Sequence, residues 1–170
     1  MRFGGSGYAN DVPKDALDIY LNDHLAGSTL GSDHAHQVEK LAAGTPLGDV
    51  MTRVAAQIDE DRDELIALME RLGVSQSTVK KAGAWVMEKA GRPKFSGTTS
   101  RDEQLGIFLA LETLSLGVAG KLALWEALAR VKPTHPELAA TDLDRLIIRA
   151  REQRATLEEE RLRAADAAFG

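Results

Sequence analysis

Apolar residues recur along most of this chain at alternating steps of three and four, the spacing of one buried face of an α-helix. The clearest run contains one exception. Its inward positions are Met51, Val54, Ile58, Asp61, Leu65, Leu68 and Leu72. A buried carboxylate is costly unless it is paired or bound to a cation, so we expect Asp61 to face a basic side chain, an imidazole or a metal ion.

Helix-start and helix-stop residues divide the chain into predicted helices. Capping residues and proline mark the starts, and glycine marks most of the ends. Runs of alternating β-branched residues, which would predict strands, do not occur. The predicted elements are a helix at 13–43 closed by Gly44, a helix at 46–73 opened by Thr45-Pro46, a short helix at 78–90, a loop at 94–99, a helix from a Ser100–Glu103 capping box to Val131, a tight turn at 132–136, and a last helix to about residue 168 that starts at Pro136 or at a Thr141–Asp144 box.

The links between these helices predict how they are arranged. The first and second helices, and the fourth and last, are separated by only a few residues, so each pair is expected to form an antiparallel hairpin. About thirty residues, which include the short helix, join the two pairs, and a connection of that length can cross the height of a bundle. The sequence therefore predicts an all-α fold: a four-helix bundle of two antiparallel hairpins joined by a long crossover, which is the ferritin-like arrangement.

Three stretches resemble bacterial ferritin-like proteins of unassigned role. They are YLNDHLAG at 20–27, DEDRDE at 59–64 and LGVAGKLALW at 116–125. The resemblance implies a ferritin-like bundle over residues 13–170, preceded by a flexible tail at 1–12. Typical members hold two metal ions with a Glu from each of two helices and a Glu-x-x-His pair from each of the other two. None of the histidines of this chain has a Glu three residues before it, so that motif is missing.

Polar residues also interrupt the apolar faces of the other helices. The candidate cluster consists of His24, His34, Asp61, Glu112, Lys121 and Gln153. The first four are candidate metal ligands, because imidazole and carboxylate inside a bundle suit iron, manganese or zinc. The other interpretation is a buried polar network that includes Lys121 and Gln153, which the lysine favours because a cation opposes metal binding. A third interpretation is a small-ligand site in the space left by inner glycines at 27, 31, 117 and 120. The alternative role of these glycines is to allow a neighbouring helix to approach closely.

Composition narrows the class of protein. The 170 residues suit one domain, 44% of them are hydrophobic, and the net charge is -5. An acidic chain argues against nucleic acid or an anionic membrane as a partner. Cysteine is absent, which excludes disulfides and thiolate chemistry. No apolar signal core or membrane-spanning run is expected, so the predicted location is the cytoplasm.

These observations predict a non-catalytic bundle rather than an enzyme, acting through another protein or through self-association and needing no cofactor. The alternative is a divergent ferritin-like protein of the iron or manganese oxidase or storage type. The charge-dense stretch 149–163 is expected to be an exposed helix laced with ion pairs, or else a protruding arm that contacts a partner.

Overall fold

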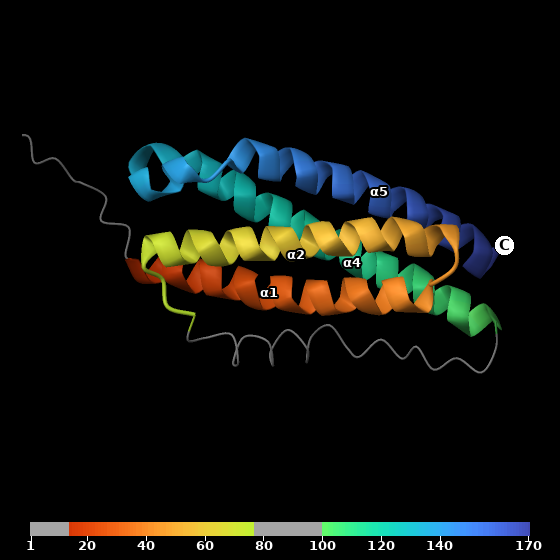
Figure 1. Ribbon diagram of the computed structural model, residues 1–170. Helices are drawn as coiled ribbons and strands as arrows, with labels where there is room; N and C mark the ends of the chain where they lie inside the picture. The colour runs from red at the N-terminus through yellow and green to blue at the C-terminus, as the bar shows by residue number, and fades with distance from the viewer. Residues whose placement is uncertain (1–13, 77–99) are drawn as a thin grey trace, which may run out of the picture.

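Four long α-helices make up most of the described chain, which is residues 14–76 and 100–170 of a computed structural model (Figure 1). The prediction of an all-helical fold is confirmed for these residues, which contain no strand. The predicted tail at 1–12, short helix at 78–90 and loop at 94–99 lie outside them. The elements are α1 (Lys14–Leu41), α2 (Pro46–Leu72), α4 (Ser100–Val131), the 3-10 helices η1 (Lys132–Thr134) and η2 (Pro136–Ala140), and α5 (Leu143–Phe169).

The turn between α1 and α2 brings the two helices close together. Helix α1 ends at Leu41, slightly earlier than predicted, and Gly44 takes the left-handed conformation with φ of +79°. Thr45 caps α2, because its hydroxyl accepts a hydrogen bond from the N–H of Gly48 at 3.2 Å. A Cβ on Gly48 would collide with the carbonyl oxygen of Ala42. Glycine at this position therefore permits the close approach of the end of α1 to the start of α2.

The start of α5 differs from both predicted starts. Pro136 opens the 3-10 helix η2, and α5 begins after Asp142, whose carboxylate accepts from the N–H of Arg145 at 3.0 Å. The hydroxyl of Thr141 instead accepts a hydrogen bond from Arg71 on α2 at 2.6 Å. Because this hydroxyl ties the loop to α2, the capping role passes to the next residue.

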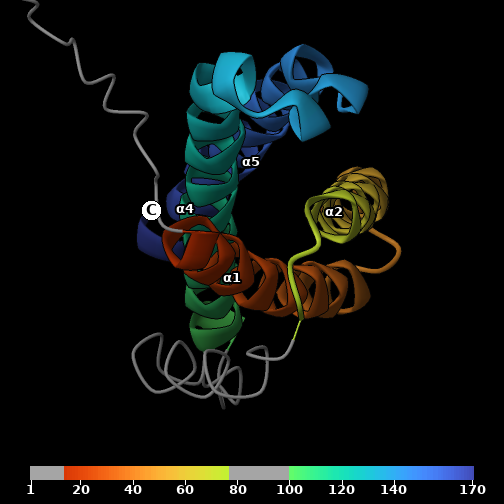
Figure 2. The same ribbon diagram turned by 90° about the vertical axis from the view of Figure 1, so that its left-hand side faces the viewer.

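The helices lie in two adjacent pairs. Helices α1 and α2 lie side by side and run in opposite directions, and so do α4 and α5 (Figure 1). Helix α1 also packs against α4, whereas the backbones of α2 and α5 stay farther apart (Figure 2). The end of α2 and the start of α4 lie at opposite ends of the molecule (Figure 1).

Two clusters of buried apolar side chains fill the bundle, one on each side of its middle. The first consists of Leu21, Leu25, Leu65, Leu68, Met69, Val74, Leu122, Leu124, Trp125, Leu128, Leu138, Leu143, Leu146 and Ala150. The second consists of Ala35, Val38, Met51, Val54, Ala55, Ile58, Ala110, Leu111, Leu114, Val118 and Leu157. Burying a side chain of leucine size contributes about 1.5–3 kcal/mol, so these clusters supply most of the drive to fold.

Helix α4 is apolar on more than its buried face. The stretch Glu103–Thr134 has an 18-residue window of mean hydropathy 1.7, of which 33% is buried. By length and composition it could cross a membrane, so the expectation that no such run exists is wrong. A core helix of a soluble protein passes the same test of length and composition.

Candidate functional site: a buried charge network

A layer of polar side chains separates the two apolar clusters. On α2, Asp61 lies between Ile58 of the second cluster and Leu65 of the first. Lys121 on α4 and Gln153 on α5 hold the same intermediate position on their own helices. The three side chains come from different helices and meet because each occupies the interruption in its own apolar seam.

Asp61 is the centre of this layer, and its residue is only 1% exposed. Its Oδ2 accepts hydrogen bonds from the Nζ of Lys121 and from the Nε2 of Gln153, the latter at 3.1 Å. Its Oδ1 accepts from the Nη2 of Arg149 on α5. Both carboxylate oxygens are therefore engaged, and two of the three donors are cationic. Hydrogen bonds with charged partners are about twice as strong as neutral ones.

Most of the remaining polar atoms of the layer also have partners; the exception is the Nε of Arg149, which is buried without a hydrogen bond to a described residue. The Nζ of Lys121 also donates to the Oε1 of Gln153 at 2.5 Å, which leaves the Gln153 amide free to donate to Asp61. The Nε2 of Gln153 also lies 3.3 Å from the Oε1 of Gln57 on α2. Arg149 donates through Nη1 to the Oε2 of Glu60 at 2.6 Å. Two cations thus meet two carboxylates, and the layer is neutral as a whole.

Burial lowers the pKa of Lys121, and the neighbouring Asp61 carboxylate opposes that effect. The positive charge of Arg149 adds slightly to the lowering. The lysine side chain is 13% exposed, and its Nζ donates hydrogen bonds to Asp61 and Gln153. Lys121 therefore connects α4 to α2. Its amine donates hydrogen bonds inside the bundle and is not available as a solvent-exposed nucleophile.

The structure brings together three of the six candidate residues, namely Asp61, Lys121 and Gln153. His24 instead packs its ring edge against Tyr20, with centroids 4.5 Å apart. His34 places Nε2 3.1 Å from the carbonyl oxygen of Ala110. Burial lowers the pKa of both histidines, against smaller opposing effects of their neighbours.

Glu112 does not face the bundle interior, contrary to its predicted position. Its side chain is 45% exposed and forms an ion pair with Arg161 on α5 at 3.5 Å. Helix α4 is apolar around much of its circumference, so the sequence does not define which of its faces is buried. Leu111 and Leu114 occupy the inward positions on either side of Glu112.

The four candidate metal ligands therefore do not form one donor set. Asp61 is the only one of them in the central layer, and its neighbours there are a lysine and an arginine. Cationic side chains repel a metal ion, so the residues present do not fit the di-metal site of ferritin-like proteins. Among residues 14–76 and 100–170, no group of three or more histidine and acidic side chains is arranged to hold a metal ion.

No described helix approaches the inner glycines closely. A Cβ built at Gly27, Gly31, Gly117 or Gly120 would meet no atom of the described residues within 4 Å. Gly27, Gly117 and Gly120 are themselves exposed. Of the alternative roles considered for these glycines, close approach of a neighbouring helix is therefore wrong for the described part of the chain.

Arg149 is the member of the network that the sequence interpretation missed, because it begins a stretch expected to be exposed. Its side chain is only 13% exposed. One signal could have identified it: Arg149 precedes Gln153 by four residues, which places both on the same side of a helix. A charge next to a predicted seam can reach inward when a buried carboxylate lies opposite.

A second polar cluster joins α1 to α2 near the surface. The ring of His36 places Nδ1 2.9 Å from Glu39 and Nε2 2.8 Å from Asp59. Asp59 also accepts from the hydroxyl of buried Ser32. Hydrogen bonding to Asp59, and then to Glu39, raises the pKa of His36. Both ring nitrogens donate to carboxylates in the protonated form, so this cluster favours the imidazolium.

No family model matches this chain, and no curated protein or solved structure matches it either.

Proposed function

We propose that this protein is a non-catalytic, ferritin-like helical bundle that acts by contacting another protein or a second copy of itself. The observation that carries the proposal is that both carboxylate oxygens of Asp61 are already hydrogen-bonded. Its two oxygens already accept from Lys121, Arg149 and Gln153, so the middle of the bundle holds an internally neutralised network. A carboxylate in these surroundings is suited to joining helices, not to binding a metal ion or activating a substrate.

Two features of the helix arrangement support the ferritin-like assignment. Each of the pairs α1–α2 and α4–α5 consists of oppositely directed neighbours (Figure 1). The end of α2 and the start of α4 lie at opposite ends of the molecule, as a long crossover between two hairpins requires (Figure 1). The ion-paired layer would then occupy the middle of the bundle, where metal-binding relatives of this fold hold their ions.

Exposed apolar side chains support a role in protein contact. Large hydrophobic residues are exposed along α5, where Ile148 is 56%, Leu162 52% and Phe169 66% exposed. Such residues mark interaction surfaces when they lie in rows or patches rather than singly.

Metal analysis of the purified, untagged protein tests the non-catalytic half of the proposal. After dialysis against iron(II) or manganese(II) and then against metal-free buffer, we expect far less than one ion per chain, with unfolding unchanged by a chelator. About one or two ions per chain that are lost in Asp61→Ala, but kept in the control Asp63→Ala, would overturn it. Asp63 is a suitable control because its side chain is 70% exposed on the same helix.

A further inference from the structure

The outward face of α5 carries an apolar row with a seven-residue spacing. Ile148, Ala155, Leu162 and Phe169 follow one another at this interval, and all four are exposed. The three large residues are 56%, 52% and 66% exposed in that order. Residues seven apart lie nearly in line along a helix, and a row of this kind is the half-seam that one helix presents to another.

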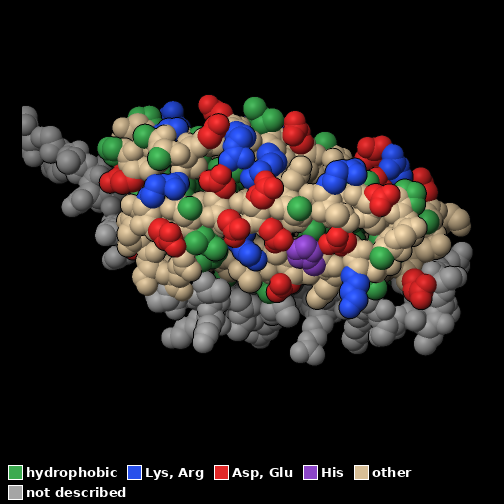
Figure 3. Space-filling view, in the orientation of Figure 1, with side chains coloured by type: hydrophobic (Ala, Val, Ile, Leu, Met, Phe, Trp, Pro, Cys, Tyr) green, Lys and Arg blue, Asp and Glu red, His purple; other side chains and the backbone are tan. Residues whose placement is uncertain are grey.

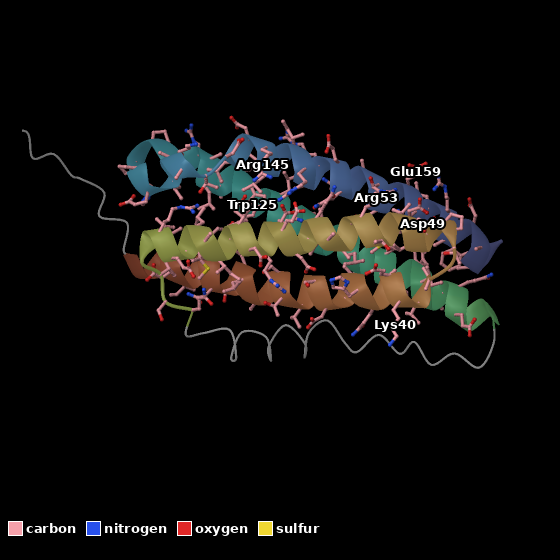
Figure 4. The ribbon with its side chains drawn as sticks, viewed as in Figure 1. Lys40, Asp49, Arg53, Trp125, Arg145 and Glu159 are labelled. Carbon is pink, nitrogen blue, oxygen red and sulfur yellow. The ribbon has the colours of Figure 1, made fainter. Side chains whose placement is uncertain are left out.

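An acidic row runs beside the apolar one. Glu152, Glu159 and Asp166 are also seven apart, all three are exposed, and each follows a member of the apolar row by four residues. Positions four apart are neighbours on a helix surface, so the two rows run side by side. Glu159 lies near the same end of the bundle as Asp49 and Arg53 of α2 (Figure 4).

Most basic side chains that border these rows already form ion pairs, and one of these pairs, that of Arg163, includes Glu159 of the acidic row. The ion pairs are Arg145–Glu64 at 2.6 Å, Arg151–Glu126 at 2.7 Å, Arg163–Glu159 and Arg163–Glu160. Arg163 therefore shares one charge between two glutamates. Glu152 and Asp166 have no ion pair with a described residue, so the flank of the apolar row keeps a negative charge.

The surface beside the start of the apolar row is hollowed. The hollow lies between α2 and α5 and is lined by Gln57, Asp142, Asp144, Arg145, Ile148, Arg149 and Glu152. Ile148 and Glu152 belong both to this hollow and to the two rows. Acidic and basic side chains lie along the boundary between α2 and α5 (Figure 3). Glu60, whose side chain is 64% exposed, adds negative charge from α2.

We infer that the outer face of α5 docks a basic amphipathic helix of a partner protein, an inference that rests on the proposed interaction role and names the partner's chemistry. Apolar side chains of the partner pack on Ile148, Ala155 and Leu162, and its Lys or Arg side chains lie along Glu152, Glu159 and Asp166. Charge complementarity selects this partner over a second copy. Two α5 helices paired antiparallel about a two-fold axis would place one acidic row against the other.

A synthetic peptide tests this inference on the full chain. The probe is an acetylated, fluorescein-labelled helix of about 24 residues, with Leu at every seventh position and Lys beside it, long enough to follow the four apolar positions. Fluorescence anisotropy measures its binding. A matched peptide with Glu in place of each Lys tests the charge requirement.

We expect the basic peptide to bind and the acidic one to bind at least about tenfold more weakly. Leu162→Ser should weaken binding by about tenfold, whereas the control Leu116→Ser, on α4, should leave it unchanged. Glu152→Lys with Asp166→Lys should reverse the preference between the peptides. Circular dichroism checks that each variant is folded.

Three results would overturn the inference: no binding of the basic peptide, equal binding of both peptides, or equal weakening by Leu162→Ser and Leu116→Ser. Light scattering adds a fourth. A dimer that Leu162→Ser dissociates would show that a second copy occupies this face. Metal content is measured independently, so failure of this docking surface is distinguishable from failure of the non-catalytic assignment.

Discussion

The Nζ of Lys121 on α4 donates to the carboxylate of Asp61 on α2, and this ion pair ties together two helices from the two halves of the bundle. Arg149 approaches the same carboxylate from α5. A single buried acid therefore connects three helices. The backbones of α2 and α5 stay apart, and the bonds from Arg149 and Gln153 to Asp61 link the two helices through side chains.

Removing the central carboxylate should strongly destabilise the fold. Asp61→Ala leaves Lys121 and Arg149 without their shared partner in a buried layer, and we expect a loss of about 3–5 kcal/mol in the free energy of unfolding. Urea denaturation followed by circular dichroism measures this loss. The exposed control Asp63→Ala should change stability by less than about 0.5 kcal/mol. Equal effects of the two substitutions would show that Asp61 is solvated.

Replacing the whole charged layer should be far less harmful than breaking it. Asp61→Leu with Lys121→Met removes the ion pairs of Asp61 with Lys121 and with Arg149. The buried part of Arg149 then faces leucine, so we expect this double variant to remain destabilised. Adding Arg149→Met should recover stability to within about 1–2 kcal/mol of the parent protein, because apolar replacements of buried ion networks are often neutral or stabilising. A triple variant less stable than the double would mean that Arg149 acts independently of Asp61.

The fold was predictable wherever local chemistry acts alone. Thr45 with Pro46 and the left-handed Gly73 define the ends of α2 through capping and backbone conformation, which depend on neighbouring residues only. The polar residue Asp61 could be assigned to the interior because six apolar positions share its seam. Its pairing with Lys121 could be offered only as one of several interpretations, since registry between distant helices depends on packing.

The predictions for Glu112 and Arg149 failed for one physical reason. Both helices concerned have ambiguous faces: α4 is apolar on several sides, and α5 is charged on several sides. Whether a side chain at the border of a seam turns inward then depends on what lies opposite. Arg149 turns inward because Asp61 needs a second donor, and Glu112 stays outside with Arg161.

The cluster around His36 should make stability depend on pH. The folded-state pKa of His36 is raised, so the favourable contribution of its imidazolium is fully present below the unfolded pKa of about 6.5 and is lost as pH rises through the folded pKa. Glu39 and Asp59 face the ring, and Arg62 lies beside them through Ser32. Because His36 is half exposed, we expect a contribution of about 0.2–1 kcal/mol.

The difference between the parent protein and His36→Gln isolates this effect. Thermal unfolding from pH 5 to pH 9 should show the variant less stable at pH 5.5 and nearly equal to the parent at pH 9. His24 and His34 act in the opposite sense, because their lowered pKa values favour unfolding as pH falls through the unfolded pKa. They are present in both proteins and cancel in the comparison. A pH-independent difference would show that His36 is not protonated in the folded state.

Two glycines in helices should respond oppositely to alanine. In an ordinary helix position Gly→Ala gains about 0.5–1 kcal/mol, because alanine loses less backbone entropy on folding. We expect that gain for Gly117→Ala, since its new Cβ meets no described atom within 4 Å. Gly48→Ala should instead lose about 1–3 kcal/mol, because its Cβ collides with the carbonyl oxygen of Ala42 and forces α1 and α2 apart. Urea denaturation of both variants measures the difference, and a gain at Gly48 would show that the turn between α1 and α2 is looser than described.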